Sequence, residues 1–274
     1  MPKDFHRKWR PPHSQAKPSL ERTSGRSDAP GDPPLEFPLL EMGKPFTFDA
    51  ALARRLIRRD INPKEAFTVR DGSGIFYRAS VKELTPEGGF AVPYESCAVS
   101  PEPSVPITLA CAVLARQRML FVAQKATELG VSRIIPLLTE HSVPPRDLEH
   151  EKAHAWPGQI VRAAKQCRRS SLPEIKPPTT LDDFLSSPEA QADLCLCLDN
   201  VGGQAAPAAA APKRILLLIG PEGGFSPAER KKLEGRAIPW LLGGRVLRAE
   251  TAVIVGLSAV QLTWGDFRRG PDGL

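Results

Sequence analysis

The chain has 274 residues, 41% of them hydrophobic and 25% charged, a balance typical of a globular protein with a sizeable core. No apolar run approaches the roughly 20 residues of a membrane span, and the start lacks the apolar core of a secretion signal, so we expect a cytoplasmic protein with no membrane partner. The five cysteines include no CxxC pair, which argues against a disulfide framework and a cysteine-rich zinc site.

Residues 1–34 are rich in proline, serine and charge and poor in large apolar residues, which predicts a disordered basic arm. Residues 35–100 are expected to form a small β-rich domain. Its strongest signal is the stretch "FTVRDGSGIFYRASVKEL", two alternating runs joined by the turn residues 71–74, which predicts a hairpin. The stretch "SPEPSVP" at 100–106 is interpreted as the linker out of this domain.

Residues 101–274 alternate between strand and helix patterns. Strands are predicted at "VPITLACAV", "SRIIPLL", "ADLCLCLD", "RILLLIG" and "PWLLG", and helices at "RMLFVAQKATELG", within 147–169, at 226–235 and at 250–263. This order indicates an α/β domain with a mostly parallel sheet, in which ligands bind at the carboxyl ends of the strands.

A glycine-rich turn, "IGPEGGFSPAE", follows the apolar run "RILLLIG". Ser226 and Glu229 have the spacing of a helix capping box, so a strand, a turn and a helix are expected in succession. Gly223 and Gly224 allow close approach of a ligand, whereas Glu222 adds a negative charge. Because the turn matches no phosphate-binding pattern, a neutral or cationic ligand fits it better than a nucleotide phosphate. A connecting turn without a ligand is the alternative.

The net charge of +6 suggests a polyanionic partner, and basic residues gather in the stretches "ALARRLIRRD" and "QIVRAAKQCRRSS". Helical spacing would place each group on one helix face. The candidate RNA-binding residues are Arg54, Arg55, Arg58, Arg59, Arg162, Lys165, Arg168 and Arg169. The alternative for either cluster is a solvated helix face.

One short pattern, "HEKAH" from His150 to His154, matches the HExxH zinc-peptidase motif. Lys152 lies inside it, Pro157 is expected to end the helix one turn later, and the third metal ligand would have to be an acid such as Glu174. Two surface histidines on a helix account for the pattern better, and no metal is expected.

Three C-terminal stretches, "LLIGPEGGFSPAE", "LLGGRVLRAETA" and "LSAVQLTWGDF", resemble in order and spacing the SPOUT-class family of small-subunit (16S) ribosomal RNA uridine-N3 methyltransferases. Upstream, "QKATELGVSRIIPLLTEHS" and "AAKQCRRSSLPEI" are similar to that family's other two blocks, so the resemblance covers about 105–268. Arg118 stands where the family commonly has a lysine or an aspartate.

The resemblance implies a C-terminal domain with a trefoil knot, S-adenosylmethionine bound in the knot, a homodimer that completes the site, and an N-terminal PUA-like β-barrel that helps to bind RNA. The implied substrate is ribosomal RNA. The two separated basic clusters, one in each domain, further suggest that this RNA is bound within a small-subunit particle. The donor's sulfonium cation suits a turn that carries Glu222. The residues assigned to the donor are Leu198, Leu218, Ile219, Gly220, Glu222, Gly223, Gly224, Leu242, Gly243, Val246, Leu247, Ala249 and Thr251.

Methylation of uridine N3 requires loss of the imide proton, and a cation near the ring oxygens would stabilise the resulting anion. Arg248 is the candidate for that role, and Glu250 or Glu222 for accepting the proton or orienting the donor. A structural Arg248–Glu250 pair is the alternative, and Thr251 is expected to begin the last helix. Rival functions are a methyltransferase of another RNA base or site, an inactive RNA-binding protein with the same fold, and the zinc peptidase.

Overall fold

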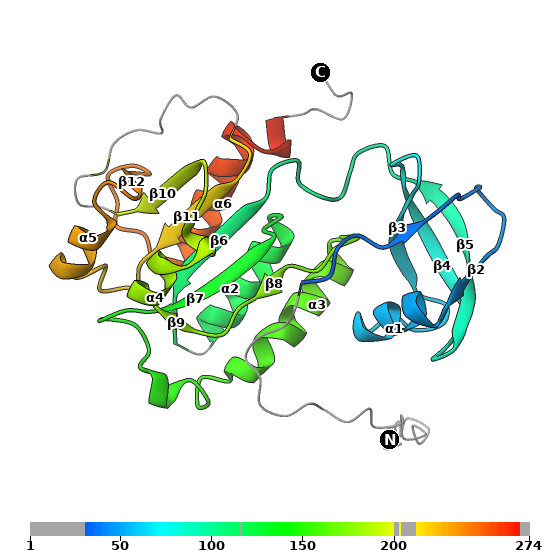
Figure 1. Cartoon of the computed structure of the whole chain (residues 1–274), viewed down its shortest axis with the longest axis horizontal. Helices are drawn as coiled ribbons and strands as arrows, with labels where there is room; N and C mark the ends of the chain where they lie inside the picture. The colour runs from blue at the N-terminus through cyan, green and yellow to red at the C-terminus, as the bar shows by residue number, and fades with distance from the viewer. Residues whose placement is uncertain (1–30, 116, 200–202, 204–211, 269–274) are drawn as a thin grey trace, which may run out of the picture.

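The computed structural model describes residues 31–115, 117–199, 203 and 212–268, and these residues build two separate β-sheets. Figure 1 shows the sheets at opposite ends of the long axis of the molecule. The first 30 residues of the expected basic arm lie outside the described residues. None of the described helices has the length and apolar content to cross a membrane.

The N-terminal sheet has five strands in the order β1-β3-β4-β5-β2, antiparallel except for the β1–β3 pair. Its strands are β1 (Glu36–Phe37), β2 (Phe46–Asp49), β3 (Ala66–Asp71), β4 (Phe76–Thr85) and β5 (Gly88–Ser96), with helix α1 (Ala50–Arg58) between β2 and β3. The predicted hairpin is confirmed as β3–β4. Its turn closes because Asp71 Oδ1 accepts hydrogen bonds from the backbone N–H groups of Ser73 and Ile75, each at 3.0 Å.

The C-terminal sheet is parallel throughout, in the order β12-β10-β11-β6-β7-β8, with β9 also paired to β7. Its strands are β6 (Ile107–Ala112), β7 (Arg133–Leu138), β8 (Glu174–Ile175), β9 (Thr179–Thr180), β10 (Leu194–Leu198), β11 (Ile215–Ile219) and β12 (Ile238–Trp240). The parallel sheet expected from the alternating pattern is confirmed. The short β8 and β9 carry too few residues to give a sequence signal.

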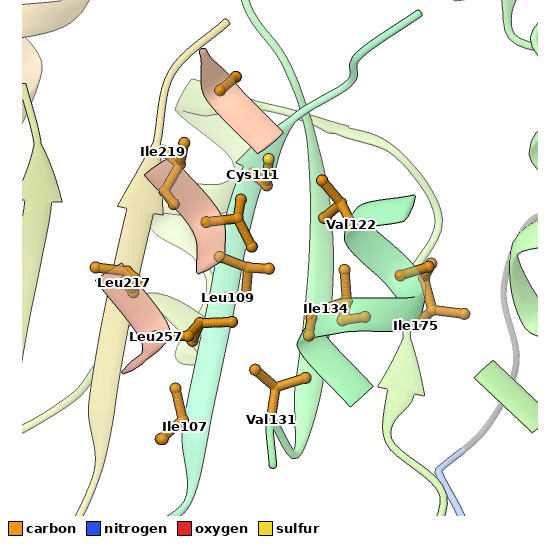
Figure 2. Close-up of a cluster of buried hydrophobic side chains, with 14 of the residues drawn as sticks. Ile107, Leu109, Cys111, Val122, Val131, Ile134, Ile175, Leu217, Ile219 and Leu257 are labelled. Atoms are coloured by element: carbon orange, nitrogen blue, oxygen red, sulfur yellow. The ribbon is translucent and has the colours of Figure 1, made fainter. Parts of the chain in front are cut away.

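Helices cover both faces of this sheet, as the continuous apolar strands require. They are α2 (Gln117–Glu128), α3 (Trp156–Gln166), α4 (Leu181–Ser186), α5 (Pro227–Leu233) and α6 (Ala249–Thr263). Helices α2, α3 and α6 contribute to the larger core, part of which Figure 2 shows between the sheet and α6. Helices α4 and α5 pack on the other face, where Cys195 and Cys197, two residues apart on β10, contact the same cluster.

Helix α6 crosses the sheet closely because of one glycine. A Cβ placed on Gly256 would lie 2.6 Å from Leu198 Cδ1 and 3.2 Å from Leu217 Cδ2. This close crossing brings the first turn of α6 beside the carboxyl ends of β10 and β11. The helix begins at Ala249, two residues before the Thr251 start that the sequence suggested.

The segment 147–169 differs from the expected helices. Residues 145–147 and 153–155 form short 3-10 helices, and Lys152 has a left-handed backbone with φ of 57°. Only Trp156–Gln166 is α-helical. Pro157 therefore lies in the first turn of α3 instead of ending a helix, a position where its missing N–H costs nothing. The two histidines of "HEKAH" are exposed, as expected, but they do not share a helix, because His150 lies in a turn and His154 in the second 3-10 helix.

Candidate active site

A cleft of about 240 Å³ opens where β10, β11 and β12 end. It is closed on one side by the glycine-rich turn after β11 and on the other by the loop that leads into α6. Its lining residues are Leu198, Asp199, Ile219, Gly220, Pro221, Glu222, Gly223, Gly224, Phe225, Arg230, Trp240, Leu242, Gly243, Arg245, Val246, Leu247, Ala249 and Ala252. The carboxyl ends of neighbouring parallel strands are where α/β sheets bind ligands.

The structure brings together most of the residues that the sequence assigned to the donor, and two of them lie elsewhere. Leu218 points to the opposite face of the sheet, where it is 1% exposed, because side chains alternate along a strand. Thr251 is exposed on the first turn of α6 and does not line the cleft. Both positions are therefore corrections to the expected donor site.

The glycine-rich turn has the local structure that its sequence predicts. Ser226 Oγ accepts the backbone N–H of Glu229, and Glu229 Oε2 accepts the N–H of Ser226 at 2.9 Å, which completes the capping box. The other oxygen of Glu229 accepts the N–H of Glu140, 2.9 Å away. The loop after β7 therefore holds the turn at the start of α5.

His141 fixes the two glycines of this turn. Its Nδ1 lies 3.1 Å from the carbonyl oxygen of Gly224, whose φ of +71° favours glycine. A Cβ on Gly223 would lie 3.1 Å from His141 Cβ. The need for glycine at residue 223 thus arises from a contact between two loops, which the sequence analysis did not identify.

Sequence reasoning also missed an ion pair in the cleft wall. Arg230, on α5, donates from Nε to Asp199 Oδ2 at 2.8 Å, and this pairing raises the pKa of Arg230. Asp199 directly follows a buried strand, which was the available signal. Arg245 adds an exposed guanidinium to the loop before α6.

Arg118 joins the two carboxylates that the sequence suggested for catalysis. Its Nη1 bonds to Glu222 Oε1, and its Nε lies 4.0 Å from Glu250 Oε1. Helix α2, the glycine-rich turn and α6 thus meet at one charged group. The sequence had marked Arg118 only as a departure from the family pattern.

Arg248 and Cys111 take no part in this group. Arg248 is the exposed N-cap of α6, does not line the cleft, and has no polar side-chain contact with another described residue, so the alternative of an Arg248–Glu250 pair is wrong in this state. Burial, followed by the charges of Glu222 and Glu250, raises the pKa of Cys111 to about 12. Its thiol is therefore neutral at neutral pH and unsuited to act as a nucleophile.

The basic clusters divide into exposed and buried members. Arg54, Arg58, Arg162 and Arg168 are exposed, Arg55 is half-buried, and Arg59 and Arg169 are buried. The two buried arginines are corrections to the expected RNA-binding set, because each guanidinium is enclosed beside a carboxylate and is not accessible to a phosphate.

Arg59 and Arg55 bind Asp32. Arg59 Nε lies 2.8 Å from Asp32 Oδ2, and Arg55 Nε lies 2.8 Å from Asp32 Oδ1. Burial acts to raise the pKa of Asp32, but the attraction of Arg59 and the hydrogen bonds from both arginines outweigh it, so the pKa is lowered. Arg59 Nη1 also bonds to the carbonyl of Ser170, which links α1 to the segment after α3.

Arg169 binds the segment between the two sheets. Its Nη2 lies 2.9 Å from Glu102 Oε2, and its Nη1 donates to the carbonyl oxygens of Thr127 and Val131 at 3.1 and 2.8 Å. Lys165 similarly donates to Glu65 Oε2 at 2.7 Å. Residues 100–106, expected to be a linker, are thus bonded to the C-terminal part at Glu102.

The zinc-peptidase alternative requires an α-helix over His150–His154, and the structure has none there. Lys152, between the two histidines, has a left-handed backbone that interrupts any helix there. The histidines therefore do not share the helical face that the motif requires. Glu174 is engaged by Arg133 at 2.6 Å and Lys176 at 2.9 Å. Within the described residues no group of three or more metal-ligating side chains occurs.

Residues 100–261 match the family model for an RNA methyltransferase domain, and the chain belongs to that family. The resemblance to ribosomal RNA small subunit methyltransferase E is confirmed by a protein of that name from Synechocystis sp., 32% identical over 202 residues, which are 72% of this chain and 65% of that protein. The chain thus spans less than two thirds of the length of this relative.

Two solved structures cover most of the chain. A putative methyltransferase from Legionella pneumophila, in complex with the bound cofactor SAM, is 32% identical with a TM-score of 0.61, over 85% of this chain and 98% of that one. A ribosomal RNA small subunit methyltransferase E from Neisseria gonorrhoeae, bound to S-adenosyl methionine, is 26% identical with a TM-score of 0.61, over 85% and 99%.

Proposed function

We propose that the chain is an S-adenosylmethionine-dependent methyltransferase of the cytoplasm that modifies N3 of a uridine in 16S ribosomal RNA. The observation that carries the proposal is the cleft at the ends of β10, β11 and β12, formed by the sequence blocks that resemble the family. The two SAM-bound structures, which align with 85% of the chain, support the choice of cofactor.

The cleft suits the chemistry of the donor. Bound S-adenosylmethionine would supply an electrophilic methyl group on a sulfonium cation. Apolar side chains such as Leu198, Trp240 and Leu247 offer a surface for the adenine ring, and the Glu222 carboxylate complements the positive sulfur. The guanidinium of Arg245 is placed to attract the donor's own carboxylate.

Glu250 and Glu222 remain the candidate proton acceptors, and their shared contact with Arg118 supports a joint role in placing the substrate. Arg248 lies one residue before α6 and is exposed, so it is free to turn toward RNA. We assign Arg248 to stabilising the uracil oxygens as the imide proton leaves, which makes it a group acting mainly in the transition state.

We extend the proposal to the finer architecture that the family resemblance implies. The C-terminal domain, 101–274, contains a trefoil knot, the N-terminal domain, 35–100, is a PUA-like RNA-binding module, and two copies of the chain form a homodimer. Support for the homodimer comes from α6, whose outward residues Val255 and Leu262 are 38% and 57% exposed. A helix with apolar residues on every side is typically buried, which supports contact of α6 with a second copy of the chain.

Identification of the methylated nucleoside tests the proposed function. Ribosomal RNA incubated with the chain and S-adenosylmethionine is expected to contain 3-methyluridine when its nucleosides are analysed by mass spectrometry, with assembled small-subunit particles preferred to naked RNA. Arg248→Ala is expected to lose most of its turnover while calorimetry finds donor affinity within severalfold of the wild type. Arg146→Ala, at an exposed arginine of a 3-10 helix, is the matched control and should stay active.

Three results would contradict parts of this proposal. A different methylated nucleoside would overturn the target base, and full activity of Arg248→Ala would overturn the role of Arg248. Donor binding without any methyl transfer would favour the inactive RNA-binding protein.

Affinity for RNA is expected to fall steeply with salt, because bound cations release counterions from phosphates. Replacing the exposed Arg54, Arg58, Arg162 and Arg168 with alanine should weaken binding and reduce the slope of log K against log salt by about 3, at roughly 0.7 to 0.9 per phosphate contact. Filter binding at several salt concentrations measures the slope, and an unchanged slope would show that these residues form only a solvated surface.

A further inference from the structure

A second cavity, of about 530 Å³, lies beside the donor cleft. Side chains of α2, α3 and the first turn of α6 line it: Gln117, Arg118, Leu120, Phe121, Gln124, Gln159 and Glu250. None of these residues lines the donor cleft. The proposed function gives the cleft its donor and names groups that act on the RNA base, but it assigns no cavity to the base.

Arg118 connects the two cavities. It lines the second cavity, while its Nη1 bonds to Glu222, which lines the donor cleft. The second cavity therefore adjoins the donor cleft where Arg118 meets Glu222. Methyl transfer requires the reacting atoms to come within about 3 to 3.5 Å, which favours adjacent sites for the two substrates.

The boundary of the cavity carries groups that complement a pyrimidine imide. Glu250 Oε2 is buried and has no hydrogen-bond partner among the described residues, so it is an unsatisfied acceptor. Its side chain is 16% exposed, on the edge of the cavity. Arg118 retains N–H donors beyond those used by Glu222. An imide presents one N–H donor between two carbonyl acceptors, which matches a carboxylate beside a guanidinium.

The rest of the cavity suits the face of a base. Phe121 is 38% exposed, and Leu120 beside it is half-buried. Gln159 Nε2 donates to Gln124 Oε1 at 3.0 Å, which fixes both amides across the gap between α2 and α3. An exposed aromatic ring next to fixed polar groups is the usual means of holding a single unstacked nucleobase.

We propose that the cavity between α2 and α3 binds the nucleobase of the RNA that is to be methylated, with its face on Phe121 and its imide edge toward Glu250 and Arg118. The inference rests on the proposed function for the identity of the substrate. It adds the position of the base and assigns Phe121 to substrate binding.

A pair of substitutions at Phe121 tests the cavity. Phe121→Leu keeps an apolar side chain but removes the ring, and it is expected to raise the KM for ribosomal RNA about tenfold, as for loss of one stacking aromatic. Phe121→Tyr restores an aromatic face and should return the KM most of the way to the wild-type value. Donor affinity, measured by calorimetry, should stay within severalfold in both. Equal KM values in the wild type and Phe121→Leu would overturn the proposal.

Photocrosslinking gives a measurement that needs neither a variant nor activity. Wild-type chain irradiated with small-subunit ribosomal RNA transcribed with 4-thiouridine is expected to crosslink at Phe121 or a neighbouring cavity residue, located by peptide mass spectrometry. Crosslinks confined to other surfaces would overturn the cavity. Crosslinking in the cavity by a chain that transfers no methyl group would support the binding site and contradict the proposed function.

Sedimentation tests whether a second copy of the chain, instead of the RNA base, occupies the cavity. The oligomeric state is expected to be the same in the wild type, Phe121→Leu and Phe121→Tyr. A change of oligomeric state that parallels the change of KM would show that Phe121 contacts a partner chain, and it would overturn the proposal.

Discussion

Gly223→Val is expected to weaken the binding of S-adenosylmethionine at least tenfold, or about 1.4 kcal/mol, while the chain stays folded. A Cβ at residue 223 would already lie 3.1 Å from His141 Cβ and 3.2 Å from its Cγ, and valine adds two methyl groups to that Cβ. The turn or the His141 loop has to move, and the turn itself lines the donor cleft. Calorimetric titration with the donor measures the affinity, and circular dichroism checks the fold.

Two further variants test whether the contact with His141 causes the loss of donor affinity in Gly223→Val. Gly158→Val is the matched control, since a Cβ there meets only Arg162 Nη1, at 3.6 Å, and lies away from the cleft. Its donor affinity should equal that of the wild type. His141→Gly combined with Gly223→Val should recover part of the lost affinity by making room. Unchanged affinity in Gly223→Val alone would remove the turn from the donor site.

Arg169→Ala is expected to lower the free energy of unfolding by about 3 kcal/mol, the low end of the cost of breaking a buried ion pair. The side chains of Arg169 and Glu102 are 4% and 13% exposed, so neither can be fully hydrated when the other is removed. The carbonyl oxygens of Thr127 and Val131 also lose a donor. Urea unfolding followed by circular dichroism measures the change.

The control for Arg169 comes from the same basic cluster, "QIVRAAKQCRRSS". Arg162 is exposed and bonds only to Gln159 among the described residues, so Arg162→Ala should change the free energy of unfolding by no more than about 0.5 kcal/mol. Equal effects of the two substitutions would contradict the structural role of Arg169. In RNA binding the order should reverse, with Arg162→Ala reducing the salt slope.

The sequence by itself determined the elements whose information is local. The β3–β4 hairpin follows from the turn chemistry at Asp71, and the start of α5 follows from the spacing of Ser226 and Glu229. The parallel sheet follows from continuous apolar strands separated by helices. The sequence also singled out most of the residues that line the cleft, because they come from two short segments of the chain, 219–225 and 242–252.

The tertiary structure alone decided what each charged side chain faces. Arg58 and Arg59 are neighbours in sequence, yet the side chain of one is 59% exposed and that of the other 6%. Both contact Asp32, but Arg59 also bonds to the carbonyl of Ser170, which lies 111 residues away, so helical spacing gave no means of distinguishing them. Arg118 likewise meets Glu222 across 104 residues of sequence. Such contacts depend on how distant segments pack, and a local pattern carries no record of that packing.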